Sequence, residues 1–253
     1  MNFNQENFFK MKTNVRNYLL TALLIVPVLF TSCDKGVIGI SGDGEIVEAT
    51  LDVRDFDGFV NNIAADIYVT QGDEFSVVME AQENIIDNLN IDEVDNGIWT
   101  IKYYRMVRWA KDVKIYITMP ELTKARINGS GDIVGENAFE GLDKLKLTIA
   151  GSGKIDMEAY AEELDLKIIG SGDIYLEGEC DILDCSISGS GGIHAFRMLA
   201  NEAGIDVSGS GDTKVNVEEA LDVHISGSGS VIYRGNPYVD SRILGSGNVK
   251  RDR

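Results

Sequence analysis

Three aspartates recur at one position of a repeated stretch. Asp132, Asp173 and Asp212 follow a Gly-Ser-Gly tripeptide in the first, third and fifth of its seven copies. If successive copies stack as neighbouring strands, these acids are roughly 9.6 Å apart. That separation is close to the ~6.5–9.5 Å between the two carboxyl groups of inverting glycosidases. The spacing therefore supports one alternative, a carbohydrate-active enzyme of the polysaccharide lyase or hydrolase type.

The other copies of the tripeptide favour a structural reading of this position. They carry Lys154, Gly192, Ser230 and Asn248 there, which are the residue types that a turn accepts. The repeats are also too short to supply the long loops that wall a substrate cleft. We therefore expect no catalytic residues and a protein that is not an enzyme.

Histidine and cysteine are scarce, and their spacing does not suggest a reactive centre. His194 and His224 each follow an inward-facing position in a different repeat, so we expect both at the surface. With no Cys/His cluster and no Ser/His/Asp spacing, we expect no metal and no cofactor. Cys185 falls at an apolar position of the repeat and is expected in the core. A disulfide between Cys180 and Cys185 is the alternative, and it requires Cα atoms within about 7 Å.

One stretch is both basic and aromatic, and we call it the island: Ile101–Lys114, IKYYRMVRWAKDVK. Aromatic side chains flanked by cations are typical contact residues. The island therefore predicts a platform for a sugar or an anionic envelope polymer, and the alternative is a hairpin with a solvated outer face. The candidate contact surface consists of Lys102, Tyr104, Arg105, Arg108 and Trp109.

Seven Gly-Ser-Gly copies determine where all of these side chains lie. The steps between copies are 22, 19, 19, 20, 18 and 18 residues, a near-constant period that is typical of repeat architectures. A phosphate-binding loop would need a helix after its glycines, and a calcium-binding roll would need a glycine-Asp turn about every nine residues. Neither pattern is present. The copies begin at Gly129, Gly151, Gly170, Gly189, Gly209, Gly227 and Gly245.

Aliphatic residues occupy fixed positions around each copy. Two residues before the first glycine stand Ile127, Ile149, Ile168, Ile187, Val207, Ile225 and Ile243, and four residues after it stand Ile133, Ile155, Ile174, Ile193, Thr213, Val231 and Val249. Polar residues alternate with them, as in half-buried strands. One such unit cannot bury its apolar face alone, whereas stacked units place like residues on one another. We therefore predict an all-β parallel β-helix with a glycine corner every 18–22 residues and outward-facing serines.

The region before the regular copies is less periodic. IAADIYV at Ile63–Val69 is similar to GSGDIYL at Gly170–Leu176, so we interpret it as a degenerate copy in which alanines replace glycine and serine. Strands are expected near Phe75–Ala81, Ile98–Tyr103 and Val113–Met119, with one helical turn after residue 82. We predict a single domain at residues 45–251, with an irregular β cap at 45–122 and regular coils at 123–251.

The N-terminal segment has the features of an export signal. Three basic residues precede an apolar run of about twelve residues, which is too short to span a membrane. The run ends in Phe30-Thr31-Ser32-Cys33, which resembles a bacterial lipobox. The resemblance implies a signal peptide at 1–32, a lipid on Cys33 and a tether at 33–44. The alternative is an ordinary secretory signal with an incidental cysteine.

Without residues 1–32 the chain is strongly acidic. The 23 Lys and Arg fall to 20 and the 41 Asp and Glu fall to 40, which leaves a net charge near −20. Such a surface repels phosphates, so we expect no nucleic acid partner.

Several stretches in a fixed order resemble the putative auto-transporter adhesin head GIN domain family of Gram-negative envelope proteins. They are GDGEIV, FDGFVNNIAADIYVTQGDEF, VKIYITMPELTKARINGSGDIVG, the GSGDI-like units and SGSGSVIYRGNPYVDSRILGSGNVKR, over about residues 40–251. Asn61, Ile63, Gly192 and Thr213 depart from the pattern, since the family usually has an aliphatic, a glycine, an acid and an aliphatic residue there.

The resemblance implies a non-enzymatic adhesin, binding or structural module of the cell envelope. Together with the lipobox it implies an outer-membrane lipoprotein with a glycan, matrix or envelope protein as ligand. An envelope-stress partner protein is the remaining alternative, and the repeat does not determine an oligomeric state.

Overall fold

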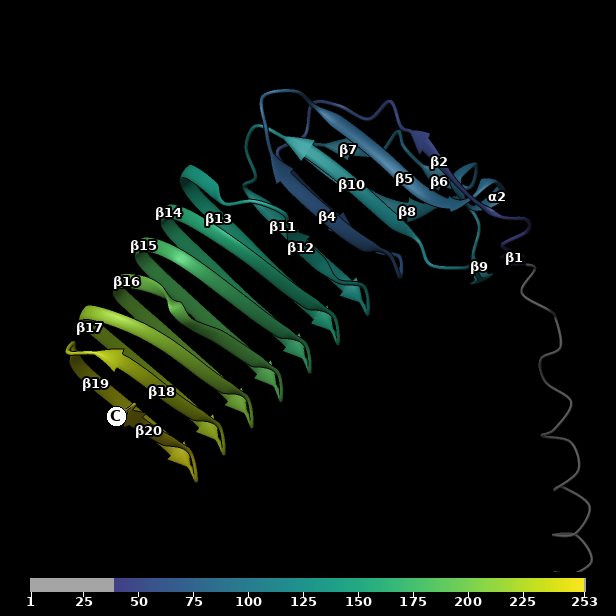
Figure 1. Cartoon of the computed structure of the whole chain (residues 1–253). Helices are drawn as coiled ribbons and strands as arrows, with labels where there is room; N and C mark the ends of the chain where they lie inside the picture. Colours follow the sequence, from purple (N-terminus) through teal and green to yellow (C-terminus); the bar gives the residue numbers. More distant parts are fainter. Residues whose placement is uncertain (1–38, 253) are drawn as a thin grey trace, which may run out of the picture. The chain divides into compact units, whose positions relative to one another are not determined.

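The computed structural model describes residues 39–252, which are almost entirely β. A β-solenoid of about seven turns joins a curled mixed sheet on its N-terminal side (Figure 1). The predicted parallel β-helix with an irregular N-terminal cap is therefore confirmed. The expected signal peptide and Cys33 lie outside the described residues. Within residues 39–252, no helix is both long and apolar enough to cross a membrane.

The elements fall into an N-terminal group and a coil group. The N-terminal group comprises β1 (Ile40–Ser41), β2 (Ile46–Thr50), β3 (Gly58–Asn61), β4 (Asp66–Gln71), β5 (Ser76–Gln82), α2 (Glu83–Ile86), β6 (Leu89–Asn90), β7 (Val94–Asp95), β8 (Ile98–Tyr103), β9 (Val107–Trp109) and β10 (Lys114–Met119). The coil group comprises β11 (Lys124–Gly129), β12 (Ile133–Gly135), β13 (Phe139–Gly151), β14 (Lys154–Gly170), β15 (Asp173–Gly189), β16 (Gly192–Gly209), β17 (Asp212–Gly227), β18 (Ser230–Gly235), β19 (Tyr238–Gly245) and β20 (Asn248–Arg251).

The predicted aliphatic columns are continuous files in the core. Successive coils pair in parallel, so that Ile149 lies opposite Ile168 and Ile168 opposite Ile187. These side chains are almost fully buried, whereas Ile243 in the last file position is 39% exposed. Thr213 occupies an aliphatic file between Ile193 and Val231, and its buried hydroxyl has no hydrogen-bond partner.

The Gly-Ser-Gly corners bring neighbouring coils close together. Gly151 has φ +144°, and a Cβ on it would lie 2.1 Å from the carbonyl oxygen of Gly129. The amide of Ser152 donates to that same oxygen at 2.9 Å. Only glycine fits such a corner, because it tolerates positive φ and has no Cβ to collide with the coil above. The serines between the glycines are exposed, as expected.

The stack begins before the first Gly-Ser-Gly. Strand β3 pairs in parallel with β11 and β4 with β12, which places Asn61 opposite Ile127 and Ile67 opposite Ile133. The degenerate copy is thus confirmed. Asn61 is buried and holds this corner with its side-chain amide, which donates to Ala65 O at 2.9 Å and accepts from Ile63 N at 3.1 Å.

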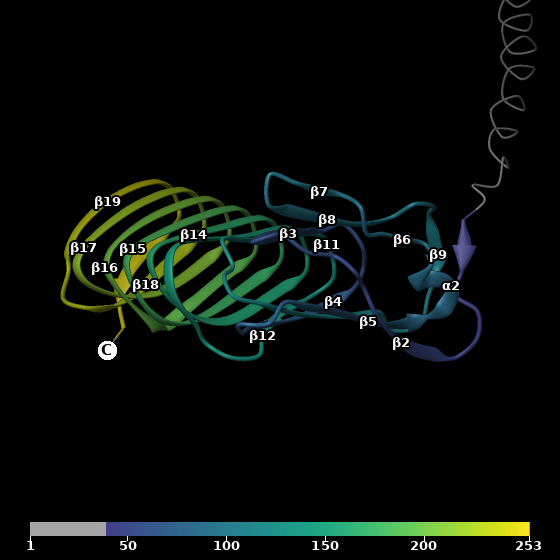
Figure 2. The same cartoon turned by 90° about the horizontal axis from the view of Figure 1, so that it is seen from above.

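One further layer lies on the degenerate copy, and its corner is much longer. Strand β8 pairs with β3 and β10 with β4, so that Ile101 lies opposite Asn61 and Ile115 opposite Ile67. Thirteen residues (102–114) connect Ile101 to Ile115, whereas five residues (128–132) connect Ile127 to Ile133. We call residues 102–114 the expanded corner. It contains β9, which lies with β1 and α2 at the end furthest from the C-terminal coils (Figure 2).

The two cysteines of the coils are unbonded and buried. Cys185 lies in a core file between Leu166 and Ile205, so its expected core position is confirmed, and the alternative disulfide is not formed. Burial raises the pKa of the Cys180 thiol to about 12 and also raises the pKa of Cys185. Both thiols therefore stay protonated and poorly nucleophilic near neutral pH.

Candidate functional site

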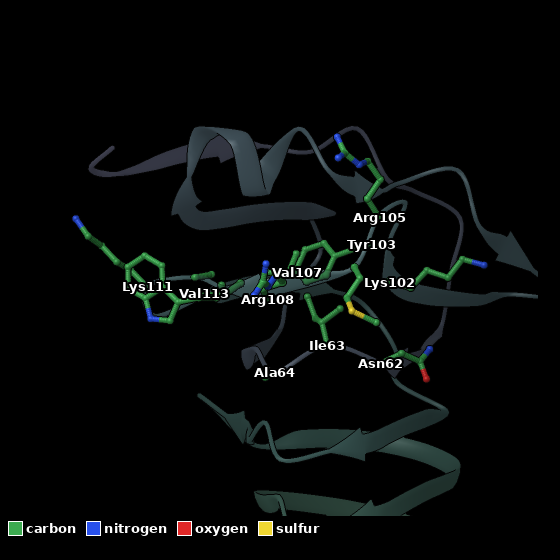
Figure 3. A pocket seen from close by; sticks show the side chains of 13 residues that line it. Asn62, Ile63, Ala64, Lys102, Tyr103, Arg105, Val107, Arg108, Lys111 and Val113 are labelled. Carbon is green, nitrogen blue, oxygen red and sulfur yellow. The ribbon is translucent and has the colours of Figure 1, made fainter. Parts of the chain in front are cut away.

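The expanded corner and the corner below it enclose a pocket of about 510 Å³ (Figure 3). Asn62, Ile63 and Ala64 line it from the degenerate copy, and the remaining residues all come from the expanded corner. They are Lys102, Tyr103, Arg105, Met106, Val107, Arg108, Trp109, Ala110, Lys111 and Val113. The island is therefore the wall of a cavity.

The middle of the pocket is apolar. Ile63, Tyr103, Val107 and Val113 gather there, and the exposed fractions of Ile63 and Val113 are only 7% each. Ile63 stands where the coils have a glycine, and here its side chain serves as pocket lining. Burial raises the pKa of Tyr103 to about 12, so the phenol is neutral at physiological pH. The pocket floor consequently carries no charge of its own.

The rim of the pocket is cationic, and no acidic residue lines it. Lys102 pairs with Glu93, and Lys111 pairs with Glu45 at 3.2 Å. Within the described part of the chain, Arg105 and Arg108 form no ion pair. Figure 3 shows Lys102, Arg105 and Lys111 pointing away from the centre of the pocket. Arg105, at the outer rim, and Arg108 are therefore the two lining cations that no carboxylate of residues 39–252 neutralises.

The candidate contact residues are only partly gathered by the fold. Lys102, Arg105, Arg108 and Trp109 line the same pocket. Tyr104 does not; its side chain is 60% exposed, and its hydroxyl donates to Asp92 Oδ2 at 3.1 Å.

Sequence reasoning missed the lining from the degenerate copy. The replacement of a glycine by Ile63 was the one signal that could have indicated it. Met106, which is 60% exposed, was also missed, because nothing in the stretch separates it from a core residue.

Side-chain amides and β1 fix the shape of the expanded corner. Ile40 lies opposite Val107, and Gly42 N donates to Trp109 O at 2.7 Å. Asn88 donates to Arg105 O at 2.8 Å and accepts from Arg105 N at 3.1 Å. The pocket wall is thereby held without a ligand. Residues 40–41, within the expected tether, are already part of the folded sheet.

The recurring aspartates hold neighbouring coils together. Asp132 Oδ1 accepts from Lys154 N at 2.9 Å, and Asp212 Oδ1 accepts from Ser230 N at 3.2 Å. Each carboxylate thus bonds to the backbone of the next coil at its own register position. Asp173 instead faces His194 on the next coil, and Asp173 Oδ1 lies 3.5 Å from His194 Nε2.

The histidines lie at the surface of the coils. His194 is 29% exposed and stacks on Tyr175 with ring centroids 4.5 Å apart, while His224 is exposed on a different coil. Within residues 39–252, no group of Cys, His, Asp and Glu is arranged to hold a metal ion.

Comparison with known proteins places the fold among solved structures. A putative adhesin from Bacteroides fragilis NCTC 9343 is 27% identical with a TM-score of 0.79, and the match covers 85% of this chain and 100% of that chain. A putative adhesin from Parabacteroides merdae ATCC 43184 is 20% identical with a TM-score of 0.73, covering 85% and 99%. A "Putative lipid binding protein" from Parabacteroides distasonis ATCC 8503 is 24% identical with a TM-score of 0.68, covering 85% and 99%.

Among curated proteins, no relative matches the chain. One protein family matches residues 55–237, a segment that runs from just before β3 to the connection between β18 and β19. The matched segment is most of the chain and includes both the expanded corner and the Gly-Ser-Gly repeats. The chain therefore belongs to the family described as "Putative auto-transporter adhesin, head GIN domain".

Proposed function

We propose that the protein is a non-enzymatic binding module of the cell envelope. In this proposal a lipid on Cys33 anchors it to the outer membrane, and the cationic rim of the pocket in the expanded corner binds an anionic ligand. The observation that carries the proposal is the pair Arg105 and Arg108. Both are exposed and lack an acidic partner among the described residues, and both line a pocket with an uncharged floor.

The charge distribution supports an anionic ligand. The chain as a whole is strongly acidic, so a cationic pocket rim attracts an anion that most of the surface repels. Arginine also suits sulfate, phosphate and carboxylate groups, because its planar guanidinium can donate two parallel hydrogen bonds to them. Trp109, 56% exposed, adds a flat apolar surface beside the arginines.

Two observations support a binding role over catalysis. One carboxylate oxygen of Asp132 and one of Asp212 accept a hydrogen bond from the backbone of a neighbouring coil. Both residues are therefore poorly placed to act as a catalytic pair. The family description names an adhesin, and the B. fragilis protein with the same fold carries that word as well. An adhesin acts outside the cytoplasm, which agrees with the lipobox at Cys33.

Binding to dextran sulfate and to neutral dextran tests the proposal. We expect the protein to bind dextran sulfate only, with an affinity that falls as salt rises. Arg105→Gln/Arg108→Gln should weaken binding at least tenfold. Arg242→Gln/Lys250→Gln removes the same charge from exposed positions of the last coil and should change it less than twofold. Equal losses in the two variants, or equal binding of both dextrans, would contradict the proposal.

A further inference from the structure

The expanded corner lies beside the start of the described chain. Strand β1 pairs in parallel with β9, and Ile40 N donates to Met106 O at 2.9 Å. Cys33 precedes Gly39 by six residues, which span at most roughly 20–22 Å when fully extended. A lipid on Cys33 would therefore keep this end of the molecule within that distance of the membrane surface.

Three large apolar side chains are exposed on the expanded corner. Tyr104 and Met106 are each 60% exposed and Trp109 is 56% exposed, and they fall within six consecutive residues. Arg105 and Arg108 alternate with them along the chain. Aromatic rings with a polar edge, flanked by arginines, are the side chains that favour the boundary between lipid headgroups and acyl chains.

One outward file of the coils carries the opposite charge. In this file Asp165 lies opposite Asp184 on the neighbouring strand, and Asp222 lies opposite Asp240. Gly204 stands between these two pairs of acids. Burial and the neighbouring Glu163 and Asp165 raise the pKa of Asp184. An anionic membrane attracts basic residues within a Debye length of about 8 Å and repels acidic ones. An anionic membrane would therefore attract Arg105 and Arg108 and repel this acidic file of the coils.

We infer that the expanded corner is a membrane-docking surface, in which Trp109, Met106 and Tyr104 enter the interface and Arg105 and Arg108 contact lipid phosphates. The inference rests on the proposed anion site and lipid anchor, and it names the headgroups of the anchoring membrane as the anion. The C-terminal coils, at the other end of the folded part (Figure 2), would then project from that surface.

Tryptophan quenching tests this inference directly. The chain has two tryptophans, and Trp99 is fully buried while Trp109 is exposed. The lipoprotein is purified with its anchor, its lipid is verified by mass spectrometry, and it is reconstituted into vesicles with acyl-brominated phosphatidylglycerol and phosphatidylcholine. We expect strong quenching of the wild type and almost none of Trp109→Phe, in which only the buried indole remains.

Charge variants and lipid composition separate docking from mere proximity. Arg105→Gln/Arg108→Gln, or vesicles of brominated phosphatidylcholine alone, should reduce the quenched fraction several-fold. Arg242→Gln/Lys250→Gln should leave it unchanged. Membrane docking would be overturned if the wild type were quenched no more strongly than Trp109→Phe. It would also be overturned if mass spectrometry found no lipid on the purified protein.

The outcome also distinguishes this inference from the proposed function. If quenching is absent but binding to dextran sulfate still depends on the arginines, docking is wrong and a soluble anionic polymer is the ligand. If the protein binds neither the vesicles nor dextran sulfate, both proposals fall together.

Discussion

The same corner of the fold is built in two ways. In the coils it is Gly-Ser-Gly, and a Cβ on Gly151 would come within 2.1 Å of the coil above. In the first layer the expanded corner replaces it and forms a pocket of about 510 Å³. From Gly151 onward the regular corners leave no room for a Cβ on the first glycine, because each corner stacks directly on the one before it. The candidate site therefore lies where the repeat is interrupted at the end of the stack.

Replacing a corner glycine should break the regular half of this comparison most strongly. Gly129 and Gly151 both have positive φ, but a Cβ on Gly129 meets nothing within 4 Å. Gly129→Ala should cost about 1–3 kcal/mol from backbone strain alone, and Gly151→Ala should exceed about 4 kcal/mol because a clash is added. Thermal denaturation compares them. Equal losses would mean that the close approach of coils is unimportant.

Truncating a file residue should have the next largest effect. Ile168 is fully buried between two coils, so Ile168→Ala should destabilise by about 2–5 kcal/mol. Ile243, in the same file, is 39% exposed in the last coil. Ile243→Ala should cost about 1 kcal/mol or less, in proportion to the apolar area that it buries. Comparable losses in urea denaturation would argue against a core that is continuous along the stack.

Asn61 tests the boundary between the two kinds of corner. Asn61→Ile restores the residue type of the file, yet it leaves the buried amide of Ile63 and the carbonyl of Ala65 without their partner. We expect destabilisation by about 1–3 kcal/mol. A more stable variant in thermal denaturation would show that the file, and not the amide, determines this corner.

The smallest expected effect concerns the stacked acids of the coils. The pKa of Asp184 is raised, so the folded state binds its proton more tightly than the unfolded state does. Its contribution to stability therefore grows as pH falls toward its ordinary pKa near 3.8 and is lost as pH rises. Asp184→Asn should stabilise by a few tenths of a kcal/mol at pH 7 in low salt, with the gain vanishing at pH 4. Destabilisation at pH 7 would contradict repulsion in the file.

The coils could be predicted from sequence, because a fixed corner and a period-2 alternation together determine register. Ile149, Ile168 and Ile187 could be assigned to one file for this reason, and so could Ile67 in the degenerate copy. The pocket could not be predicted to the same degree. Its wall depends on the pairing of β1 with β9, two very short strands that are far apart in sequence and have no apolar alternation. Composition alone selected the island, so Tyr104 was grouped with the pocket-lining residues although it does not line the pocket.

Hydrogen exchange with and without dextran sulfate tests most directly whether binding belongs to the expanded corner. We predict slower exchange on ligand addition in residues 102–113 and unchanged exchange in the coils from 173 to 229. Protection that appears in the coils while residues 102–113 are unaffected would contradict this assignment.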